Sequence, residues 1–156
     1  MKWTILIAIA IFAIAGLVYG KKQVTPKLPK NYRYWTHTKS MVIPDKTHGL
    51  YGFHNIYANK KAFKALRKKS KKYPEGAKFV VSFYDVVEKD GTTNQGGKLM
   101  DALMIKSKTA KETGGWIFAV FDPKGKPKAI NAKKDCFQCH ADNASKTDFV
   151  FHKYIR

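Results

Sequence analysis

The run CFQCH at residues 136–140 constrains this chain more than any other feature, because it holds the only two cysteines among the 156 residues. Two cysteines three positions apart, followed at once by a histidine, form the attachment pattern of a c-type haem. In that pattern each cysteine binds one vinyl group of the haem through a thioether bond, and the histidine binds the iron. We therefore expect Cys136 and Cys139 to anchor one haem c covalently and His140 to be its iron ligand.

Other uses of a Cys-x-x-Cys pair fit this sequence less well. A structural zinc site needs further ligands at suitable spacing, and the chain has no second cysteine pair. A redox-active dithiol is expected between a strand and a helix early in a domain, whereas residues 136–139 follow a lysine-rich segment near the C-terminus. A haem is the interpretation that also uses the adjacent histidine.

The N-terminus predicts export from the cytoplasm. A lysine at the start, an apolar run at residues 5–18 and a small residue at Gly20 are typical of a signal peptide, which we place at residues 1–20. The run is short for a membrane span, which needs about 20 apolar residues. An uncleaved anchor is the alternative, because Trp3 and Tyr19 bracket the run as interfacial aromatic residues do.

The rest of the chain is interpreted as an arm followed by one domain. Residues 21–31 are polar and contain two prolines, which favours a linker. Residues 32–156 have the size of a single domain and would form the cytochrome domain. We expect it in the periplasm or an equivalent extracytoplasmic compartment, where c-type haem is attached in bacteria, and membrane-anchored if the signal is uncleaved.

The formal net charge of +19 predicts contact with something anionic. An exported protein rarely meets nucleic acid, so we expect an acidic protein, a membrane surface or small anions instead. A charged surface that serves only solubility is the alternative. Two copies of so basic a chain repel each other, so an acidic homologous protein is a candidate beside an acidic redox partner.

The apolar pattern predicts a mainly β domain of the α+β class, with an antiparallel sheet and one clear packed helix. Strands or extended segments are expected at residues 32–43, 50–57, 78–87, 116–121 and 149–154, whereas residues 98–105 fit a strand or a helix. The helix is expected at residues 59–72, where Asn59 would be the N-cap and lysines surround a narrow apolar stripe. Asp90 and Gly91 predict a turn between strands.

Several short stretches occur in a characteristic order along the chain. They are YRYWTHTKSMVI at residues 32–43, GFHNIYAN at 52–59, YPEG at 73–76, TGGW at 113–116, the CFQCH run and DFVF at 148–151. On these stretches the chain resembles the cytochrome P-460 family, most closely its branch without a lysine cross-link, cytochrome c′-beta. The resemblance implies an antiparallel sheet with a helix beside it, a dimer, and one haem ligated by a single histidine.

The resemblance implies two different chemistries. In the cross-linked enzymes, which oxidise hydroxylamine, a lysine nitrogen is bonded to the porphyrin edge and a carboxylate near the open iron face relays protons. The c′-beta branch binds nitric oxide under a phenylalanine cap. Here only Lys78 and Lys89 flank the strand on which the lysine is expected, and Asp85 is the one acid inside that strand, either in the pocket or in a salt bridge at the sheet edge. The binder branch is therefore favoured.

By position in the family pattern, we nominate Phe53 and Phe79 for the distal side of the haem and Arg67 as a hydrogen-bond donor to a bound ligand. Core packing for the two phenylalanines, and a plain surface charge for Arg67, are equally open. A sixth protein ligand to the iron would instead favour an electron carrier. The candidates are His37, His48, His54, His152, Met41, Met100 and Met104. The resemblance implies an open sixth position.

The leading hypothesis is an exported cytochrome with one haem c that binds nitric oxide, or a similar small ligand, at an apolar distal site or passes electrons in nitrogen-oxide metabolism. One alternative is a hydroxylamine-oxidising enzyme with a lysine–haem cross-link. Another is an electron carrier that docks an acidic partner through its basic helix, for which association should weaken with salt. A homodimer and a heterodimer are both open.

Overall fold

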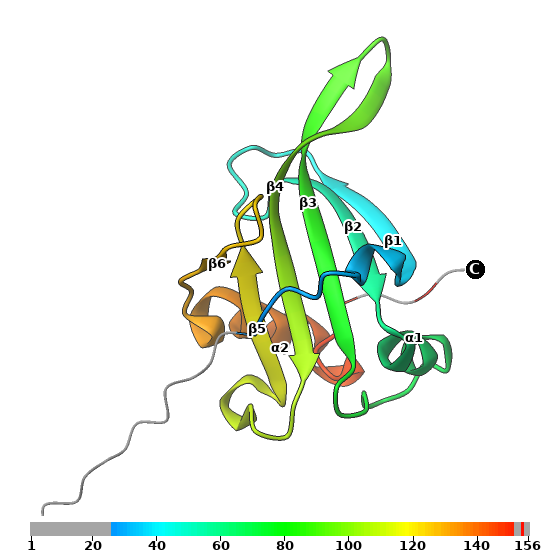
Figure 1. Cartoon of the computed structure of the whole chain (residues 1–156), viewed down its shortest axis with the longest axis vertical. Helices are drawn as coiled ribbons and strands as arrows, with labels where there is room; N and C mark the ends of the chain where they lie inside the picture. Colours follow the sequence, from blue (N-terminus) through cyan, green and yellow to red (C-terminus); the bar gives the residue numbers. More distant parts are fainter. Residues whose placement is uncertain (1–25, 152–153, 155–156) are drawn as a thin grey trace, which may run out of the picture.

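The computed structural model describes residues 26–151 and 154, and an antiparallel sheet lies at the centre of this part of the chain (Figure 1). Each strand pairs with the next one in the sequence, so the sheet is a simple meander. Its strands are β1 (Thr36–Ile43), β2 (Gly52–Ala58), β3 (Lys78–Lys89), β4 (Thr92–Lys106), β5 (Trp116–Phe121) and β6 (Pro127–Lys128). The predicted fold class, an antiparallel sheet with packed helix, is confirmed.

In the described part of the chain, two short α-helices lie outside the sheet. Helix α1 (Lys60–Arg67) connects β2 to β3, and α2 (Gln138–Ala144) follows β6 after a π-helical segment at Ala132–Phe137. Short 3-10 turns occupy Tyr32–Tyr34, Lys111–Thr113 and Ser145–Thr147. In Figure 1, α2 lies across one face of the sheet, behind β4 and β5. No helix in the described part of the chain has the length and apolar character needed to cross a membrane.

Side chains alternate between the two faces of the sheet, as expected for strands. The register aligns Ala58, Phe79, Met104 and Phe118 in one row across β2 to β5. This row and its neighbours form a core cluster with residues of α1, with Cys136 and Phe137, and with the C-terminal segment. We call the side of the sheet that carries this row the motif face.

The opposite side, the far face, has a smaller core. Its buried residues are Tyr32, Val80, Leu103, Ala119 and Phe121, and Leu28 and Trp35 of the N-terminal segment pack against them. The predicted signal peptide lies outside the described residues. Residues 26–31 of the predicted arm are described, and Leu28 among them contacts this core.

Helix α1 begins as predicted and ends earlier than predicted. The Asn59 side chain accepts a hydrogen bond from the backbone N–H of Ala62 at 2.9 Å, so it is the N-cap. The helix was expected to reach residue 72 but stops at Arg67, and Lys69 adopts a left-handed φ of 52°. The physical reason is that the buried stripe ends at Leu66, and the lysines that follow repel one another without adding packing.

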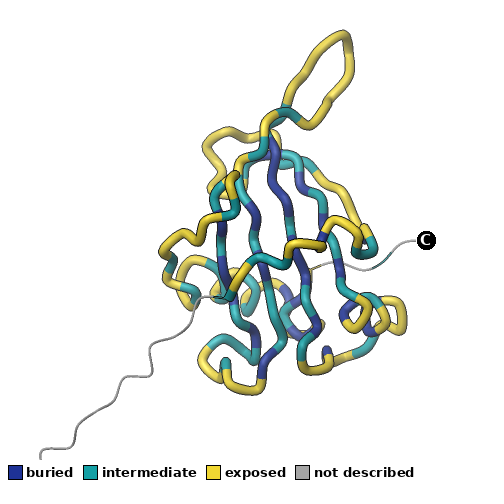
Figure 2. The backbone as a smooth tube through the Cα atoms, in the orientation of Figure 1, coloured by how far each residue is buried: buried dark blue, intermediate teal, exposed yellow. Residues whose placement is uncertain are grey.

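Strands β3 and β4 form the longest hairpin, which extends beyond the rest of the sheet (Figure 1). Asp90 and Gly91 have φ values of 50° and 73°, as a two-residue hairpin turn with two left-handed residues requires, so the predicted turn is confirmed. The open choice for residues 98–105 resolves as strand. Figure 2 shows the tip of this hairpin exposed and the middle of β3 buried.

The prediction of a last β segment at residues 149–154 was wrong for the residues that the structure describes. Residues 148 and 149 form a turn after α2, and residues 150, 151 and 154 belong to no strand. Asp148 and Phe149 have φ values of 53° and 66°, which a strand cannot contain. The apolar alternation of this segment serves packing against the motif face instead, where Val150 is buried.

Candidate functional site

The CFQCH run lies on a helical segment that crosses the motif face. Cys136 and Phe137 end the π-helix, and Cys139 and His140 lie in the first turn of α2. The π-helix begins at Ala132, and its N-cap is Asn131, whose side chain accepts a hydrogen bond from the N–H of Lys134 at 3.1 Å. Single π-helical turns are rare and are often found at functional sites. The lysine-rich sequence before the motif did not predict this helix.

One ring nitrogen of His140 is hydrogen-bonded to the backbone, and the other is free to bind a metal ion. Its Nδ1 lies 2.7 Å from the carbonyl oxygen of Phe149, and because a carbonyl only accepts, Nδ1 carries the proton and Nε2 has the free lone pair. The ring packs between Phe118, with centroids 5.1 Å apart, and Phe151, at 4.5 Å. Burial lowers the pKa of His140, and the hydrogen bond to Phe149 opposes that shift. A neutral imidazole with a fixed tautomer is the form that binds a metal ion.

The two cysteines are free thiols in different surroundings. Cys139 is exposed, whereas Cys136 is half-buried against the motif-face core. Burial, followed by the nearby charge of Asp135, raises the pKa of Cys136 to about 11. The Cys136 thiol is therefore protonated at neutral pH. Phe137 between them turns its ring toward Phe118, with centroids 6.4 Å apart, and toward Phe149, at 5.1 Å.

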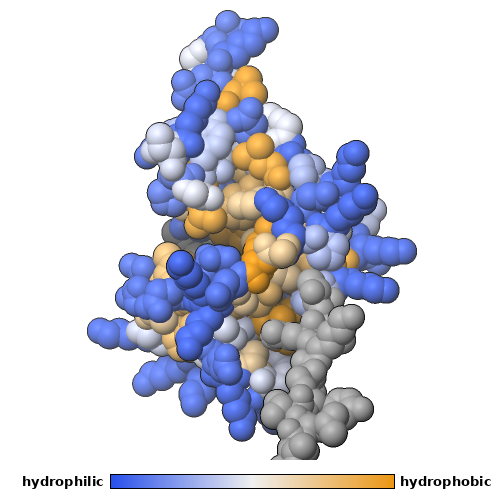
Figure 3. Space-filling view, turned by 90° about the vertical axis from the view of Figure 1, so that its left-hand side faces the viewer, coloured by the Kyte–Doolittle hydropathy of each residue, from blue (hydrophilic) through white to orange (hydrophobic). Residues whose placement is uncertain are grey.

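Beside this helical segment the motif face keeps an incompletely covered apolar floor. Its residues are partly exposed and come from three adjacent strands: Val81, Met100, Ala102 and Val120. Figure 3, which views the molecule from the β6 edge of the sheet, shows apolar side chains gathered in a hollowed band between hydrophilic ones. Two thiols, an imidazole with a free Nε2 and an apolar floor are the groups that a covalently attached haem requires, so these residues fit that cofactor.

The three nominated distal residues lie in different places. Phe79 is on the motif face, 3% exposed, and packs against Tyr73 and Trp116 with ring centroids 5.5 and 6.2 Å away. Phe53 pairs with Tyr84 and alternates onto the opposite side of β2 from Ile56, so the structure does not bring it to His140's face. The physical reason is the strict two-residue period of β2, which has no bulge against β3.

Arg67 is exposed in the last turn of α1, and α1 packs on the motif-face core through Ala62 and Leu66. Lys78 is half-buried at the start of β3, and Lys89 is exposed at the hairpin tip. Asp85 accepts a hydrogen bond from the hydroxyl of Tyr51 at 2.6 Å, which lowers the pKa of Asp85. The structure therefore pairs this acid with a tyrosine.

His54 is a buried histidine on the motif face. Its ring lies 4.2 Å from that of Phe83 on β3, and its Nε2 is 2.8 Å from the carbonyl oxygen of Leu50. Burial lowers its pKa, and the hydrogen bond to Leu50 opposes the shift. The alternation of His54 with Ile56 in the sequence was the signal that could have placed it on this face.

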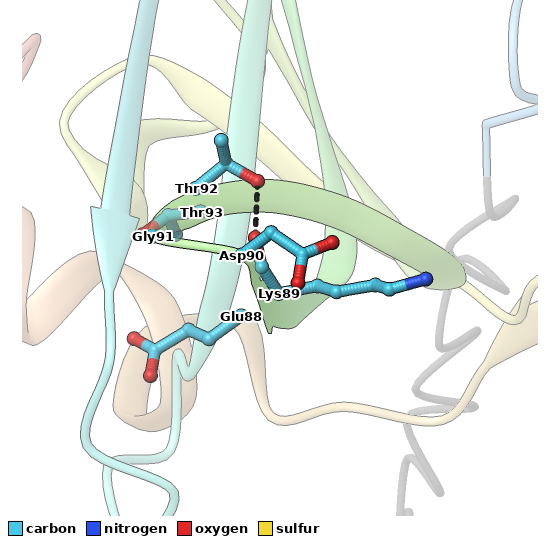
Figure 4. A pocket seen from close by; sticks show the side chains of 6 residues that line it. All are labelled: Glu88, Lys89, Asp90, Gly91, Thr92 and Thr93. Atoms are coloured by element: carbon cyan, nitrogen blue, oxygen red, sulfur yellow. Dashed lines mark hydrogen bonds between the residues drawn. The ribbon is translucent and has the colours of Figure 1, made fainter.

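A second hollow lies at the tip of the β3–β4 hairpin, and it is not a comparable site. It is lined only by the exposed turn residues Glu88, Lys89, Asp90, Gly91, Thr92 and Thr93. Figure 4 shows the side chains of Glu88 and Lys89 pointing in different directions. The one hydrogen bond drawn there joins the Thr92 hydroxyl to the Lys89 carbonyl at 2.6 Å, which closes the turn itself.

Metal-binding chemistry is concentrated in the motif. Among residues 26–151 and 154, no three His, Cys, Asp or Glu side chains are grouped so that they could hold an ion by themselves. A metal held here with a single protein ligand would need other donors, as a porphyrin provides.

Comparison with known families agrees with this chemistry. The family model described as Cytochrome P460 matches residues 29–152, which is most of the chain and includes the motif. The chain belongs to the cytochrome P460 family. Among curated proteins, a sequence search finds no match. As a cytochrome P460 protein, it is a haem protein of nitrogen metabolism, and the resemblance drawn from the sequence stretches is confirmed at the level of the family.

Proposed function

We propose that this cytochrome P460 protein is exported, carries one haem c on Cys136 and Cys139 with His140 as the iron ligand, and binds nitric oxide or a similar small neutral ligand. The observation that carries the proposal is the arrangement of His140. Its Nδ1 is held by the Phe149 carbonyl at 2.7 Å, so Nε2 is the free nitrogen, on the same short helical segment as both thiols.

Covalent attachment needs no oxidant. Each thiol adds across one vinyl group: the sulfur bonds to one carbon, and the thiol hydrogen moves to the other. When bound, the haem supplies an iron centre that coordinates small ligands and changes its oxidation state. The four partly exposed residues of the floor, Val81, Met100, Ala102 and Val120, carry no charge. They exclude water and stabilise no anion, which favours a neutral diatomic ligand.

The test is the absorption spectrum of the reduced, purified holoprotein before and after addition of nitric oxide. We expect the spectrum to change, whereas a strong, sharp α-band that does not respond would contradict ligand binding. Acidified acetone should leave the pigment on the wild-type protein and extract it from a Cys136→Ser/Cys139→Ser variant. His140→Ala should alter the spectrum, and the matched variant of an exposed histidine, His37→Ala, should not.

The intact mass separates this proposal from the hydroxylamine-oxidising branch. Simple attachment predicts the mass of the chain plus one haem. A lighter product with a strongly red-shifted Soret band would indicate a lysine–haem cross-link. The interior of β3 between Lys78 and Lys89 contains no lysine, which supports simple attachment.

A second candidate function is electron transfer to an acidic partner, and the surface of α1 favours it. The helix and the loop after it expose eight basic side chains and no acidic one: Lys60, Lys61, Lys64, Arg67, Lys68, Lys69, Lys71 and Lys72. Such a patch steers an anionic protein, an acidic homologue in a heterodimer included, and its effect weakens with salt. A homodimer would have to keep these patches apart.

Stopped-flow association with an acidic redox protein tests the second candidate. Lys64→Glu with Lys68→Glu should slow association strongly at low salt, while Lys124→Glu in the exposed turn after β5 should slow it less. An association rate that is independent of ionic strength would contradict docking through α1.

A further inference from the structure

The turn between α2 and the C-terminal segment has an unusual backbone. Asp148 and Phe149 are consecutive non-glycine residues with left-handed φ values of 53° and 66°. A side chain makes this conformation unfavourable, so it persists only where surrounding contacts determine it. Such strain often marks a functional position.

The carboxylate of Asp148 is held from two different elements. Its Oδ1 accepts a hydrogen bond from Lys106 Nζ at 2.7 Å, and its Oδ2 accepts one from the backbone N–H of Tyr73 at 2.8 Å. Lys106, at the end of β4, also donates to the carbonyl of Gly114 at 3.2 Å. Asp148 is 9% exposed, so these bonds lie largely out of water and hold its side chain firmly.

The backbone of the same residue is held from β5. The indole Nε1–H of Trp116, which is fully buried, donates to the carbonyl of Asp148 at 2.8 Å. Gly114 allows Phe149, the residue after Asp148, to approach, because a Cβ at position 114 would lie 2.4 Å from the ring of Phe149. Residue 148 is thus fixed from β4, from β5 and from the loop after α1.

The residue that follows, Phe149, accepts a hydrogen bond from His140. The N–H of Phe149 donates to Ala144 at 2.8 Å, and the Phe149 carbonyl accepts from His140 Nδ1 at 2.7 Å. A hydrogen bond to the second nitrogen of a metal-binding imidazole sets its tautomer and orientation and makes it a stronger ligand. The direction of the Phe149 carbonyl therefore controls the orientation of the His140 ring and the strength of Nε2 as a metal ligand.

We propose that Asp148 is a positioning residue for the iron ligand: held by Lys106, Tyr73 and Trp116, it fixes the Phe149 carbonyl that orients His140. This inference rests on the proposed role of His140 as the iron ligand. Asp148 acts through two intermediate groups and does not touch the cofactor, so its effect is seen in the strength of the iron–histidine bond.

The test is Asp148→Asn in the haem-loaded protein, which weakens the contacts of Oδ1 and Oδ2. We expect the iron–histidine stretching frequency of the ferrous protein, measured by resonance Raman, to fall. We also expect the reduction potential to rise, because a weaker imidazole donor stabilises the ferric state less. The matched control is Asp101→Asn, a buried aspartate that pairs with Lys98 on the far face. It should cost stability and leave both readouts unchanged.

Lys106 gives a second route if Asp148→Asn does not mature. Lys106→Met should shift both readouts in the same direction by less, and Lys106→Arg should restore them in part, because a cation again faces Asp148. Readouts that stay at the wild-type values in the Asp148 and Lys106 variants would overturn the inference and leave the proposed function standing. A wild-type protein without any iron–histidine stretch would overturn both.

Discussion

Each face of the sheet buries an aspartate paired with a lysine, and the two pairs differ in what they connect. On the far face, Asp101 pairs with Lys98 three residues earlier in the same strand, and its Oδ1 accepts from the hydroxyls of Ser82 at 2.7 Å and Tyr32 at 3.0 Å. On the motif face, Lys106 pairs with Asp148, which lies 42 positions further along the chain.

The difference shows that the two faces of the sheet have different roles. The far-face pair connects strands β3 and β4 to the 3-10 turn at Tyr32, so its contacts stay within the far-face core. The motif-face pair connects a strand to the segment that orients His140. A buried pair contributes little stability by itself, since desolvation offsets the attraction. The value of the second pair lies in the geometry that it sets.

The largest expected effect comes from the two ends of β5. Trp116 and Phe121 are both fully buried but point to opposite faces. Replacing either with alanine should lower the free energy of unfolding by about 3–5 kcal/mol. Only Trp116→Ala also removes the hydrogen bond to the Asp148 carbonyl, so only this variant should speed hydrogen exchange at residues 149 and 150.

Urea unfolding and amide exchange by mass spectrometry measure the two quantities. Trp116→Phe is a milder variant that keeps an aromatic ring and deletes the donor, which should cost about 1–3 kcal/mol because a buried carbonyl loses its partner. Equal exchange at these amides in the Trp116 and Phe121 variants would remove the distinction between the faces.

The next largest effect contrasts two glycines with similar backbone angles. Gly114 has a φ of 63° and a Cβ there would lie 2.8 Å from the ring of Phe137, whereas Gly91 has a φ of 73° and nothing within 4 Å. Gly91→Ala should therefore cost only the backbone strain, about 1 kcal/mol. Gly114→Ala must also displace aromatic rings beside the motif, and overpacking adds about 1–3 kcal/mol.

Thermal unfolding of the two variants compares these costs directly, and the haem content of purified protein adds a second measure. We expect reduced loading for Gly114→Ala alone. If both variants lost the same stability and kept full loading, close packing of Phe149 and Phe137 would have no role in the site.

A smaller effect should appear in the pH dependence of stability. Burial holds the pKa of His54 on the motif face below the usual value of about 6.5. Below that value the unfolded chain binds a proton that the folded chain does not, so the stability present above about pH 6.5 is lost as the pH falls toward the folded-state pKa. His54→Phe should make this loss in acid smaller.

Urea unfolding at pH 7.5 and 5.5 measures the loss in each variant. His37→Phe, an exposed position on the neighbouring strand, is the control and should keep the acid sensitivity of the wild type. An undiminished loss in His54→Phe would mean that other groups of the protein cause it.

The smallest effect is expected at the tip of the β3–β4 hairpin, which contributes to neither face. Glu88→Gln and Thr93→Ala change exposed residues of the hairpin tip. At these positions β3 no longer pairs with β2, and β4 does not pair with β5. Each should alter the free energy of unfolding by less than about 0.5 kcal/mol. A larger loss in chemical denaturation would show that this ribbon packs on a further surface in solution.

Local patterns predicted the central strands of the sheet better than its edges and the C-terminal segment. Strand β5 was expected at residues 116–121 and has these bounds, because a short apolar run followed by a turn leaves few alternatives. The alternation of side chains along β3 places Phe79 and Val81 on one face and Val80 on the other. Asn59 was recognised as a cap for the same reason: the signal and the contact lie within a few residues.

Long-range contacts could not be predicted in this way. Phe53 was nominated from its place in a family pattern, and only the pairing of β2 with β3 shows that it lies on the far side. The strand predicted at residues 149–154 began inside the turn, because the contacts that hold the left-handed backbone of Asp148 come from Tyr73, Lys106 and Trp116. No spacing rule in the sequence connects these residues.

The hydrogen bond from His140 to Phe149 joins residues that are nine positions apart. The far end of that interval is pinned to the sheet, and the near end begins beside the second cysteine. The interval therefore has a fixed length. A residue inserted within it would rotate the imidazole away or detach the carbonyl, whereas an insertion in the exposed loop at residues 44–47 would lengthen only a surface connection. New loops can therefore be grafted onto this scaffold in the surface loop after β1, but not between His140 and Phe149.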